Sequence, residues 1–430
     1  MSNAKDSVAS DFSAAVSGQP FPPELVERSG CPFDPPAGRT RLHEQAPMSK
    51  ITLLNGAQAW LVTGYDEALA ILADTRFSSD NFRYTSALQL TPEQVEETKD
   101  NGFAPNQLER EDGMFLLMDP PEHTRLRRVL AGQFTTRRMQ ALENRVREIS
   151  VQLIDDMRAQ GTEADLVQSF ALPLPSMVIC ELLGVPYEDR DGFQARSATT
   201  LDTSKPLEER RQAGFEQYEF MRNLVATKRQ RPGDDDILSG MIHGDLIADP
   251  PVTDSELVDI GTLLLDAGHE TTANQLALST FALLQNPDQL AALRADPSLI
   301  DSGVEELLRY LSIVHMAPFR VATEDLNIGG FTIAKGDTVV VSTPNVNRHP
   351  GLWHDPDKLD LSRPRSRHLA FGHGVHQCIG QQLARVELRI GLTELLTRLP
   401  DLHLTVPAEE IQMRTQMIVF GVHTLPVGWR

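Results

Sequence analysis

The spacing of hydrophobic and polar residues predicts a mainly helical protein. From Pro121 almost to Pro287, apolar residues recur at the intervals of three and four positions that amphipathic helices show. Breaks fall at proline- and glycine-containing turns such as Gly184-Val185-Pro186. Residues 66–74 favour a further helix nearer the N-terminus.

Short β-type runs lie outside this helical region. Residues 51–54 and 59–63 flank Asn55-Gly56, a dipeptide that is typical of a hairpin turn. Two more β-rich regions cover residues 327–342 and 402–427. The pattern as a whole therefore predicts a mainly α fold with small β-sheets at its edges.

The longest helix is expected to begin after Thr253 and to end at Asn286-Pro287. The Thr253 side chain can cap this helix while Glu256 reaches back to it, as in a capping box. At ~1.5 Å per residue the helix is about 50 Å long, enough to cross the domain. Its middle carries the segment Ala267-Gly268-His269-Glu270-Thr271-Thr272, in which glycine and threonines weaken helical structure. We expect the helix to open locally at Gly268.

Composition limits the organisation of the chain and its partners. The length of 430 residues would allow two or three domains, but no linker or low-complexity run divides the chain. We expect a flexible segment at 1–20 and a single domain at 21–430. The net charge of −20 argues against nucleic acid as a partner. No run approaches the ~20 apolar residues of a membrane anchor, and only three cysteines indicate a reducing, cytoplasmic setting.

The strongest chemical signal is the run Phe371-Gly372-His373-Gly374-Val375-His376-Gln377-Cys378-Ile379-Gly380, which leads into a helical pattern. A cysteine just before a helix lies where backbone N–H groups and the helix dipole favour a negative sulfur. Small neighbouring residues let a flat macrocycle approach closely. A lone cysteine is more often buried and inert, but the spacing of the whole run argues for a thiolate ligand to haem iron.

The spacing Phe-Gly-x-Gly-x-His-x-Cys-x-Gly resembles the haem-binding signature of the cytochrome P450 family. The resemblance covers nearly the whole chain and is greatest to soluble actinobacterial members that oxidise secondary metabolites and xenobiotics. It implies a fold of that family, with haem b between the long central helix and the cysteine loop. Cys378 is then the iron ligand, and the expected haem contacts also include Phe371, Gly372, Gly380 and Ala267. One departure is Asn347-Arg348-His349-Pro350, where relatives more often have Asp before the proline.

Four basic side chains match the family's partners for the haem propionates. His123 and Arg127 are four residues apart on one predicted helix, Arg320 follows Ala317-Pro318-Phe319, and His376 lies two residues before Cys378. A buried carboxylate needs positive or hydrogen-bonding partners. Each residue taken alone would be interpreted as a solvated surface group, but together they predict a propionate site.

Glu270 and Thr271 resemble the family's acid–alcohol pair. With Gly268 they are the predicted catalytic residues: Glu270 as a proton source and Thr271 as a hydroxyl that hydrogen-bonds oxygen. A second motif, Glu306 and Arg309, resembles the family's buried Glu-x-x-Arg pair, joined by an arginine that Arg363 matches best. We expect these three residues to support the cysteine loop without taking part in catalysis.

The resemblance implies a monooxygenase that inserts one oxygen atom of O2 into a hydrophobic small molecule by hydroxylation or epoxidation. A polyketide, macrolide or terpenoid is the expected kind of substrate. Because the chain carries no flavin or nicotinamide motif, the electrons must come from a ferredoxin with its reductase, or from a flavodoxin, and we expect a monomer. Six arginines predict a basic docking patch for this partner: Arg125, Arg128, Arg137, Arg138, Arg365 and Arg367.

The substrate pocket is predicted only by position. A long polar stretch at 76–113 is expected to form part of a lid, in which Arg83 is a candidate anchor for a substrate carboxylate. The other candidates are mostly apolar and could equally belong to the core: Leu263, Leu264, Val314, Ala317, Met417 and Ile418.

Two other functions use the same cysteine loop. A peroxide-driven or nitric-oxide-reducing haem-thiolate enzyme is not expected to carry Glu270-Thr271, and a non-enzymatic haem sensor would need no proton relay. The acid–alcohol pair therefore favours the monooxygenase.

Overall fold

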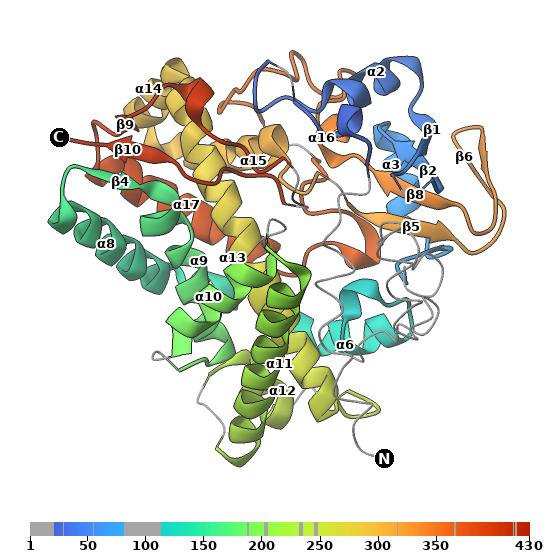
Figure 1. Cartoon of the computed structure of the whole chain (residues 1–430), viewed down its shortest axis with the longest axis horizontal. Coiled ribbons are helices and arrows are strands. Elements are labelled where there is room, and N and C mark those ends of the chain that lie inside the picture. The colour runs from blue at the N-terminus through green and yellow to red at the C-terminus, as the bar shows by residue number, and fades with distance from the viewer. Residues whose placement is uncertain are drawn as a thin grey trace.

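The computed structural model of the protein describes residues 21–430 except 29, 55, 81–112, 187–188, 202–204, 232–234, 245–247, 316, 365–366, 416 and 418. The flexible segment predicted at 1–20, most of the predicted lid, Arg83, Arg365 and Ile418 therefore lie outside the described residues. Figure 1 shows a large helical part beside a smaller part that contains most of the strands.

Helices make up most of the described chain, and the prediction of a mainly α fold with small sheets is confirmed. The α-helices are α2 (Ala37–Gln45), α3 (Tyr65–Ala73), α6 (Glu122–Ala131), α7 (Thr136–Ala141), α8 (Glu143–Gln160), α9 (Pro173–Leu183), α10 (Arg190–Leu201), α11 (Leu207–Gln230), α12 (Ile237–His243), α13 (Asp254–Gln285), α14 (Pro287–Ala295), α15 (Ile300–Leu311), α16 (Thr343–Val346) and α17 (Gln381–Arg398). One-turn elements include η4 (Phe115–Leu117), the π-helical η5 (Val167–Ala171) and η8 (Gly374–His376).

The strands form three small sheets. The largest has the order β1-β2-β8-β5-β3, with β2 and β8 parallel and the other neighbours antiparallel. The second has the order β4-β10-β9, and β6 pairs with β7. Their bounds are β1 (Met48–Thr52), β2 (Gln58–Val62), β3 (Phe77–Ser78), β4 (Glu163–Asp165), β5 (Phe319–Ala322), β6 (Leu326–Ile328), β7 (Phe331–Ile333), β8 (Thr338–Val341), β9 (His403–Leu404) and β10 (Pro426–Gly428).

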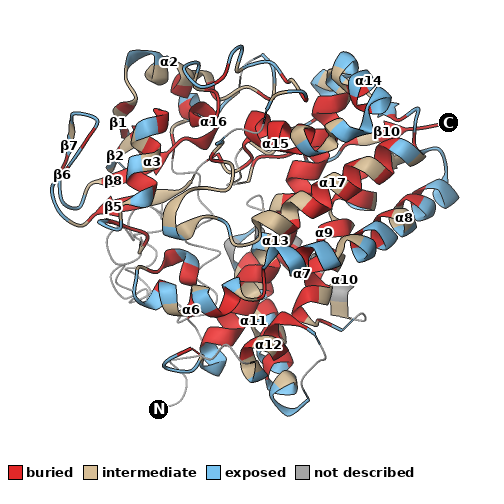
Figure 2. Ribbon diagram, turned by 180° about the vertical axis from the view of Figure 1, so that it is seen from behind, coloured by how far each residue is buried: buried red, intermediate tan, exposed pale blue. Residues whose placement is uncertain are grey.

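The central helix α13 has the boundaries that the capping signals predicted. Thr253 caps it, and the Glu256 side chain accepts a hydrogen bond from the Thr253 N–H at 2.8 Å, which completes the capping box. The helix packs against α9, α11 and α17 (Figure 1), and its surface is buried along most of its length (Figure 2). It therefore anchors the main hydrophobic core, which also includes Leu126, Phe170 and Phe281.

Some local expectations were wrong. The predicted opening at Gly268 is not seen, since α13 is continuous α-helix through this residue. A Cβ at Gly268 would come within 2.9 Å of Ile179 on α9, so this glycine permits close helix packing. Strand β4 interrupts the region interpreted as wholly helical. The β-rich region expected at 402–427 contains only β9, β10 and two isolated bridges within its described part.

Candidate functional site

The loop before α17 holds Cys378 by backbone contacts. The Cys378 N–H donates to the Phe371 carbonyl at 2.9 Å, and Gly380 occupies the N-cap position of α17. Gly372 and Gly374 adopt positive φ angles of 69° and 72°, which disfavour other residues. A Cβ at Gly374 would also lie 2.1 Å from a carbonyl oxygen of α3, so this loop lies directly against α3.

Cys378 has an environment suited to a metal-bound sulfur. Its side chain is accessible to solvent, although protein surrounds it closely enough for burial to dominate and raise the pKa of the thiol. The backbone N–H groups of Gly380 and Gln381 and the charges of Arg127 and Arg385 act in the opposite direction and favour the thiolate. A cation bonded to sulfur would supply the remaining stabilisation, because metals bind the deprotonated form.

The four predicted propionate partners lie together. The rings of His123 on α6 and His376 in the cysteine loop are 4.1 Å apart. Arg127 donates to the backbone carbonyl of Gln377, which ties α6 to the same loop. Arg320 on β5 is buried, and its charge acts on both histidines. The structure thus brings together residues from three separate parts of the sequence.

This cluster contains buried basic groups, some of whose ring nitrogens lack partners among the described residues. Burial is the main cause that lowers the pKa of His123 to about 4, and the charge of Arg127 is the next largest. Burial is also the main cause that lowers the pKa of His376 to about 2, with the charge of Arg320 next. Burial lowers the pKa of Arg320 to about 10. Neither ring nitrogen of His123, nor Nε2 of His376, has a hydrogen-bond partner among the described residues. Buried donors of this kind fit a ligand with two carboxylates, as haem b has.

The middle of α13 presents an accessible stretch although its other faces are buried. Ala267 is exposed, and Gly268 and Thr271 are partly exposed, whereas residues 272–283 are buried. The Thr271 hydroxyl donates to the Ala267 carbonyl at 2.7 Å, the competition with helical bonding that the sequence suggested. A small residue and a hydroxyl are therefore accessible at the middle of an otherwise buried helix.

The Glu270 carboxylate takes part in a network that sequence analysis missed. Arg414, in the segment before β10, contacts Glu270 Oε1 at 2.5 Å, and Asn274 Nδ2 donates to the same oxygen at 3.0 Å. Asn274 lies four residues after Glu270, so the helical spacing could have revealed it. No sequence signal connects Arg414 with this helix.

A second acidic residue, Asp266, lies one turn before Glu270. The Ser197 hydroxyl on α10 donates to Asp266 Oδ1 at 3.1 Å and lies 3.3 Å from His269 Nε2. Burial raises the pKa of Asp266 to about 6, against the opposing effect of His269. These contacts tie α10 to the accessible stretch of α13, and no sequence signal predicted them.

The Glu306–Arg309 pair is buried as the resemblance implied. Arg309 donates to both carboxylate oxygens of Glu306, at 2.7 and 2.8 Å, and Arg363 Nε contacts the same carboxylate at 3.2 Å. Arg309 also donates to the carbonyl of Asn347 at 2.9 Å. The Asn347 side chain in turn accepts from the N–H of Leu369 at 2.7 Å, which links this scaffold to the start of the cysteine loop.

Some of the predicted pocket residues are buried in the core and others are only partly buried. Leu263 and Leu264 are buried in the main core, while Val314 and Ala317 are only partly buried. Met417 is fixed by its neighbours, because its carbonyl lies 2.6 Å from His315 Nε2 and its sulfur 2.9 Å from Arg414 Nε.

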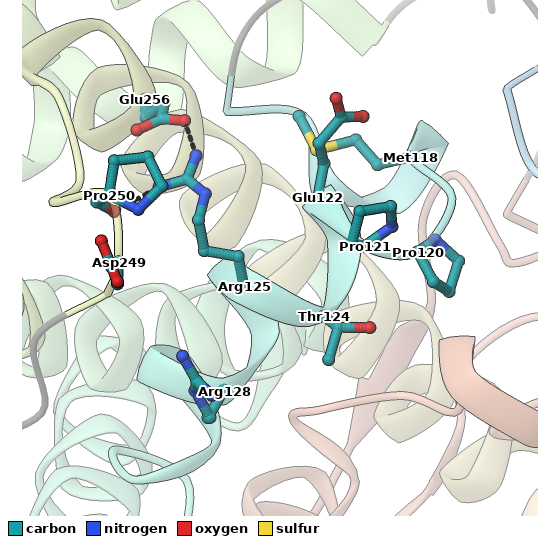
Figure 3. Close-up of a pocket in the computed structure, with 10 residues that line it drawn as sticks. All are labelled: Met118, Pro120, Pro121, Glu122, Thr124, Arg125, Arg128, Asp249, Pro250 and Glu256. Atoms are coloured by element: carbon teal, nitrogen blue, oxygen red, sulfur yellow. Dashed lines mark hydrogen bonds and ion pairs between the residues drawn. The ribbon is translucent and has the colours of Figure 1, made fainter.

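Two arginines of the predicted basic patch form ion pairs within the protein. Arg125 pairs with Glu256 and donates to the Pro250 carbonyl at 3.1 Å, in the wall of a cavity of about 930 Å³ beside the start of α6 (Figure 3). Arg138 pairs with Asp235 at 2.9 Å. Arg128 and Arg137 are exposed.

Comparisons with known proteins show the family to which the chain belongs. Residues 203–427 match the family model for cytochrome P450. The chain is 48% identical over 400 residues to cytochrome P450-SU2 of Streptomyces griseolus, covering 93% of this chain and 95% of that protein. It is 43% identical to pentalenic acid synthase of Streptomyces avermitilis, covering 93% of this chain and 95% of that protein. The crystal structure of CYP105P1 in complex with filipin I superposes with a TM-score of 0.86, at 40% identity, covering 96% of this chain and 99% of that chain.

Proposed function

The chain belongs to the cytochrome P450 family of haem b monooxygenases, and we propose that it oxidises a hydrophobic secondary metabolite with electrons from a ferredoxin. The observation that carries the proposal is the meeting of Cys378 with the four basic side chains of His123, Arg127, Arg320 and His376. A thiol ligand beside a cluster of basic groups that can hold propionates is what a haem-thiolate enzyme needs.

The bound haem iron supplies O2 activation, and a thiolate ligand favours cleavage of the O–O bond. In this proposal the chain's own residues hold the cofactor and manage protons. Cys378 binds the iron, and the basic cluster holds the propionates. Ala267 and Gly268 keep side chains away from the accessible stretch of α13.

Glu270 and Thr271 are the proposed proton-handling residues. Thr271 belongs to the accessible stretch and supplies a hydroxyl, while the adjacent Glu270 supplies a largely buried carboxylate. The Thr271 hydroxyl is held by the Ala267 carbonyl, so its oxygen remains able to accept a hydrogen bond. A general acid at such a position typically contributes about 10²–10⁴-fold to rate.

The proposed substrate class is supported by the relatives. Pentalenic acid synthase and the complex of CYP105P1 with filipin I both concern secondary metabolites by name. The interior residues Val314 and Ala317 are apolar and only partly buried, which suits a hydrophobic ligand. The ferredoxin is proposed because no electron-carrying motif was found in the chain.

The proposal is tested on purified protein. Reduction under carbon monoxide should give the red-shifted Soret band of thiolate-ligated haem, and Cys378→Ser should lose it. A panel of polyketides, macrolides and terpenoids, screened by the Soret shift of the ferric protein, should then contain ligands that are oxidised when ferredoxin, its reductase and NADPH are present. Absence of the red-shifted band in the unmodified protein would contradict the proposal.

A further inference from the structure

Arg414 belongs to a segment that the backbone fixes against the middle of α13. Its N–H donates to the Gly421 carbonyl at 2.8 Å, and Met413 and Val422 form an antiparallel bridge. Gly421 approaches α13 so closely that a Cβ there would lie 1.7 Å from Asn274 Oδ1. These backbone contacts among the described residues of the segment 413–422 therefore place Arg414 beside Glu270.

The contacts of Arg414 are specific and largely shielded. Its guanidinium contacts Glu270 Oε1 at 2.5 Å and donates to Asn274 Oδ1 at 3.2 Å. The exposed fractions of the Arg414 and Glu270 side chains are 14% and 12%. Surface ion pairs contribute little, but a shielded pair that shares a third partner holds a fixed geometry more strongly.

Both contacts to the carboxylate end on one oxygen. Arg414 and Asn274 meet Glu270 Oε1, whereas Oε2 makes no hydrogen bond within the described part of the chain. A carboxylate pinned through one oxygen keeps the other available to take up and release a proton. Glu270 also adjoins Thr271, the proposed hydroxyl partner.

We propose that Arg414 is a positioning residue for proton delivery: with Asn274 it fixes Glu270 through Oε1 and leaves Oε2 for the proton. This inference rests on the proposed function and extends it to a residue far from the helix in sequence. It also couples the proton step to the segment 413–422, where Met417 contacts the Arg414 side chain.

The expected consequence concerns where electrons go. Insertion uses substrate, O2, two electrons and two protons, and yields hydroxylated product and water. Without an organic substrate, O2 takes two electrons and two protons to give hydrogen peroxide, or four of each to give two water molecules. Formation of water requires O–O cleavage and therefore timely proton delivery. Misplacing Glu270 should shift the balance toward peroxide.

The test uses the haem-loaded protein with plant-type ferredoxin, ferredoxin reductase and NADPH, and no organic substrate. Arg414→Gln should raise hydrogen peroxide formed per NADPH by about threefold or more, a small part of what a general acid contributes. Arg414→Lys, which keeps the charge, should give an intermediate ratio. Arg398→Gln, which breaks the remote pair of Arg398 with Glu394 on α17, should leave the ratio unchanged.

A second measurement reports on the pair without turnover. Thermal midpoints of Arg414→Gln, Glu270→Gln and the double variant form a double-mutant cycle. The sum of the decreases in midpoint of the two single variants should exceed the decrease of the double variant. Additive losses, or a peroxide ratio of Arg414→Gln equal to that of the unmodified protein, would overturn the inference. If the unmodified protein lacks the carbon monoxide band, the proposed function fails instead, and the thermal cycle still tells whether the pair exists.

Discussion

The imidazole rings of His123 and His376 lie 4.1 Å apart although more than half of the chain separates them in sequence. Burial lowers the pKa of both histidines, and the charges of Arg127 and Arg320 lower it further. A protein gains nothing in stability from this crowding of bases. The proposed haem propionates, an anionic ligand that all of them would contact, would account for the arrangement.

Replacing Arg320 by Met should weaken the retention of haem. The buried guanidinium would be lost while a similar volume is kept, and a hydrogen bond to a charged group contributes about 1.5–3 kcal/mol. We therefore expect haem dissociation to accelerate by about 10- to 100-fold. Transfer of haem to excess apomyoglobin, followed by absorbance, measures this rate.

The matched control is His354→Ala, because the His354 side chain is 92% exposed. It should release haem at the rate of the unmodified protein. If Arg320→Met also retained haem as well as the unmodified protein, the basic cluster would not be the propionate site.

Part of this site could be predicted from the spacing of residues that are close together in the sequence. Cys378 and His376 share one loop, and His123 and Arg127 share one helical face, so the sequence interval fixes their relation. Arg414 contacts Glu270 although 144 positions separate them in the sequence. That contact depends on the path of segment 413–422, which residue spacing does not encode. The contact of the Asn347 side chain with the N–H of Leu369 is likewise not encoded in residue spacing.

Breaking the buried pair on α15 should destabilise the whole protein. Arg309→Leu would leave the Glu306 carboxylate, which is 2% exposed, without its closest cation. Loss of one partner of a buried pair costs about 3–5 kcal/mol. Guanidinium denaturation of the haem-loaded protein should show a correspondingly lower midpoint.

Arg145→Ala provides the comparison, since Arg145 pairs with Glu181 at 2.6 Å but is 46% exposed. Loss of this exposed pair should lower the free energy of unfolding by about 0–1 kcal/mol. Equal midpoints for the two variants would show that the α15 pair does not support the fold.

Glu387 on α17 should make stability fall as the pH rises. Burial raises the pKa of its carboxyl to about 8, and the Thr272 hydroxyl on α13 opposes this only in part. The folded protein therefore keeps a proton that the unfolded chain releases near its ordinary pKa of 4.5. The contribution to stability is greatest below 4.5 and declines as the pH rises toward 8.

Glu387→Gln should remove this decline. Near neutral pH the free energy of unfolding of the variant should be higher by up to roughly 3 kcal/mol, because the glutamine amide does not have to bind a proton when the protein folds. Thermal midpoints at pH 5 and pH 8 measure the difference, with exposed Glu410→Gln as the control. A variant whose midpoint falls with pH as steeply as that of the unmodified protein would contradict this assignment.

The fold shows the same division between local and long-range information. The capping box at Thr253 and Glu256 is complete within four residues, and α13 begins where it predicts. Gly268 was expected to open the helix because glycine lacks intrinsic helical preference. Its tight contact with Ile179 on α9 instead makes it a packing residue, which only the neighbouring helix could show.

The exposed arginines Arg128 and Arg137 should determine how well a ferredoxin reduces the protein. Arg125 was an equally good candidate by sequence, but its guanidinium is already occupied by Glu256 and the Pro250 carbonyl. Exposed charges on an interface mainly change the rate of association and its dependence on salt. The double variant Arg128→Glu, Arg137→Glu should therefore raise the Michaelis constant for ferredoxin, by about tenfold at low ionic strength, with kcat little changed.

Salt distinguishes this effect from a structural one. At an ionic strength near 1 M, where the screening length is only about 3 Å, the variant and the unmodified protein should converge. Arg41→Glu on α2 carries the same kind of charge reversal at another exposed position and should behave like the unmodified protein. A Michaelis constant that stays unchanged in the double variant, or a difference that high salt does not remove, would show that the ferredoxin docks elsewhere.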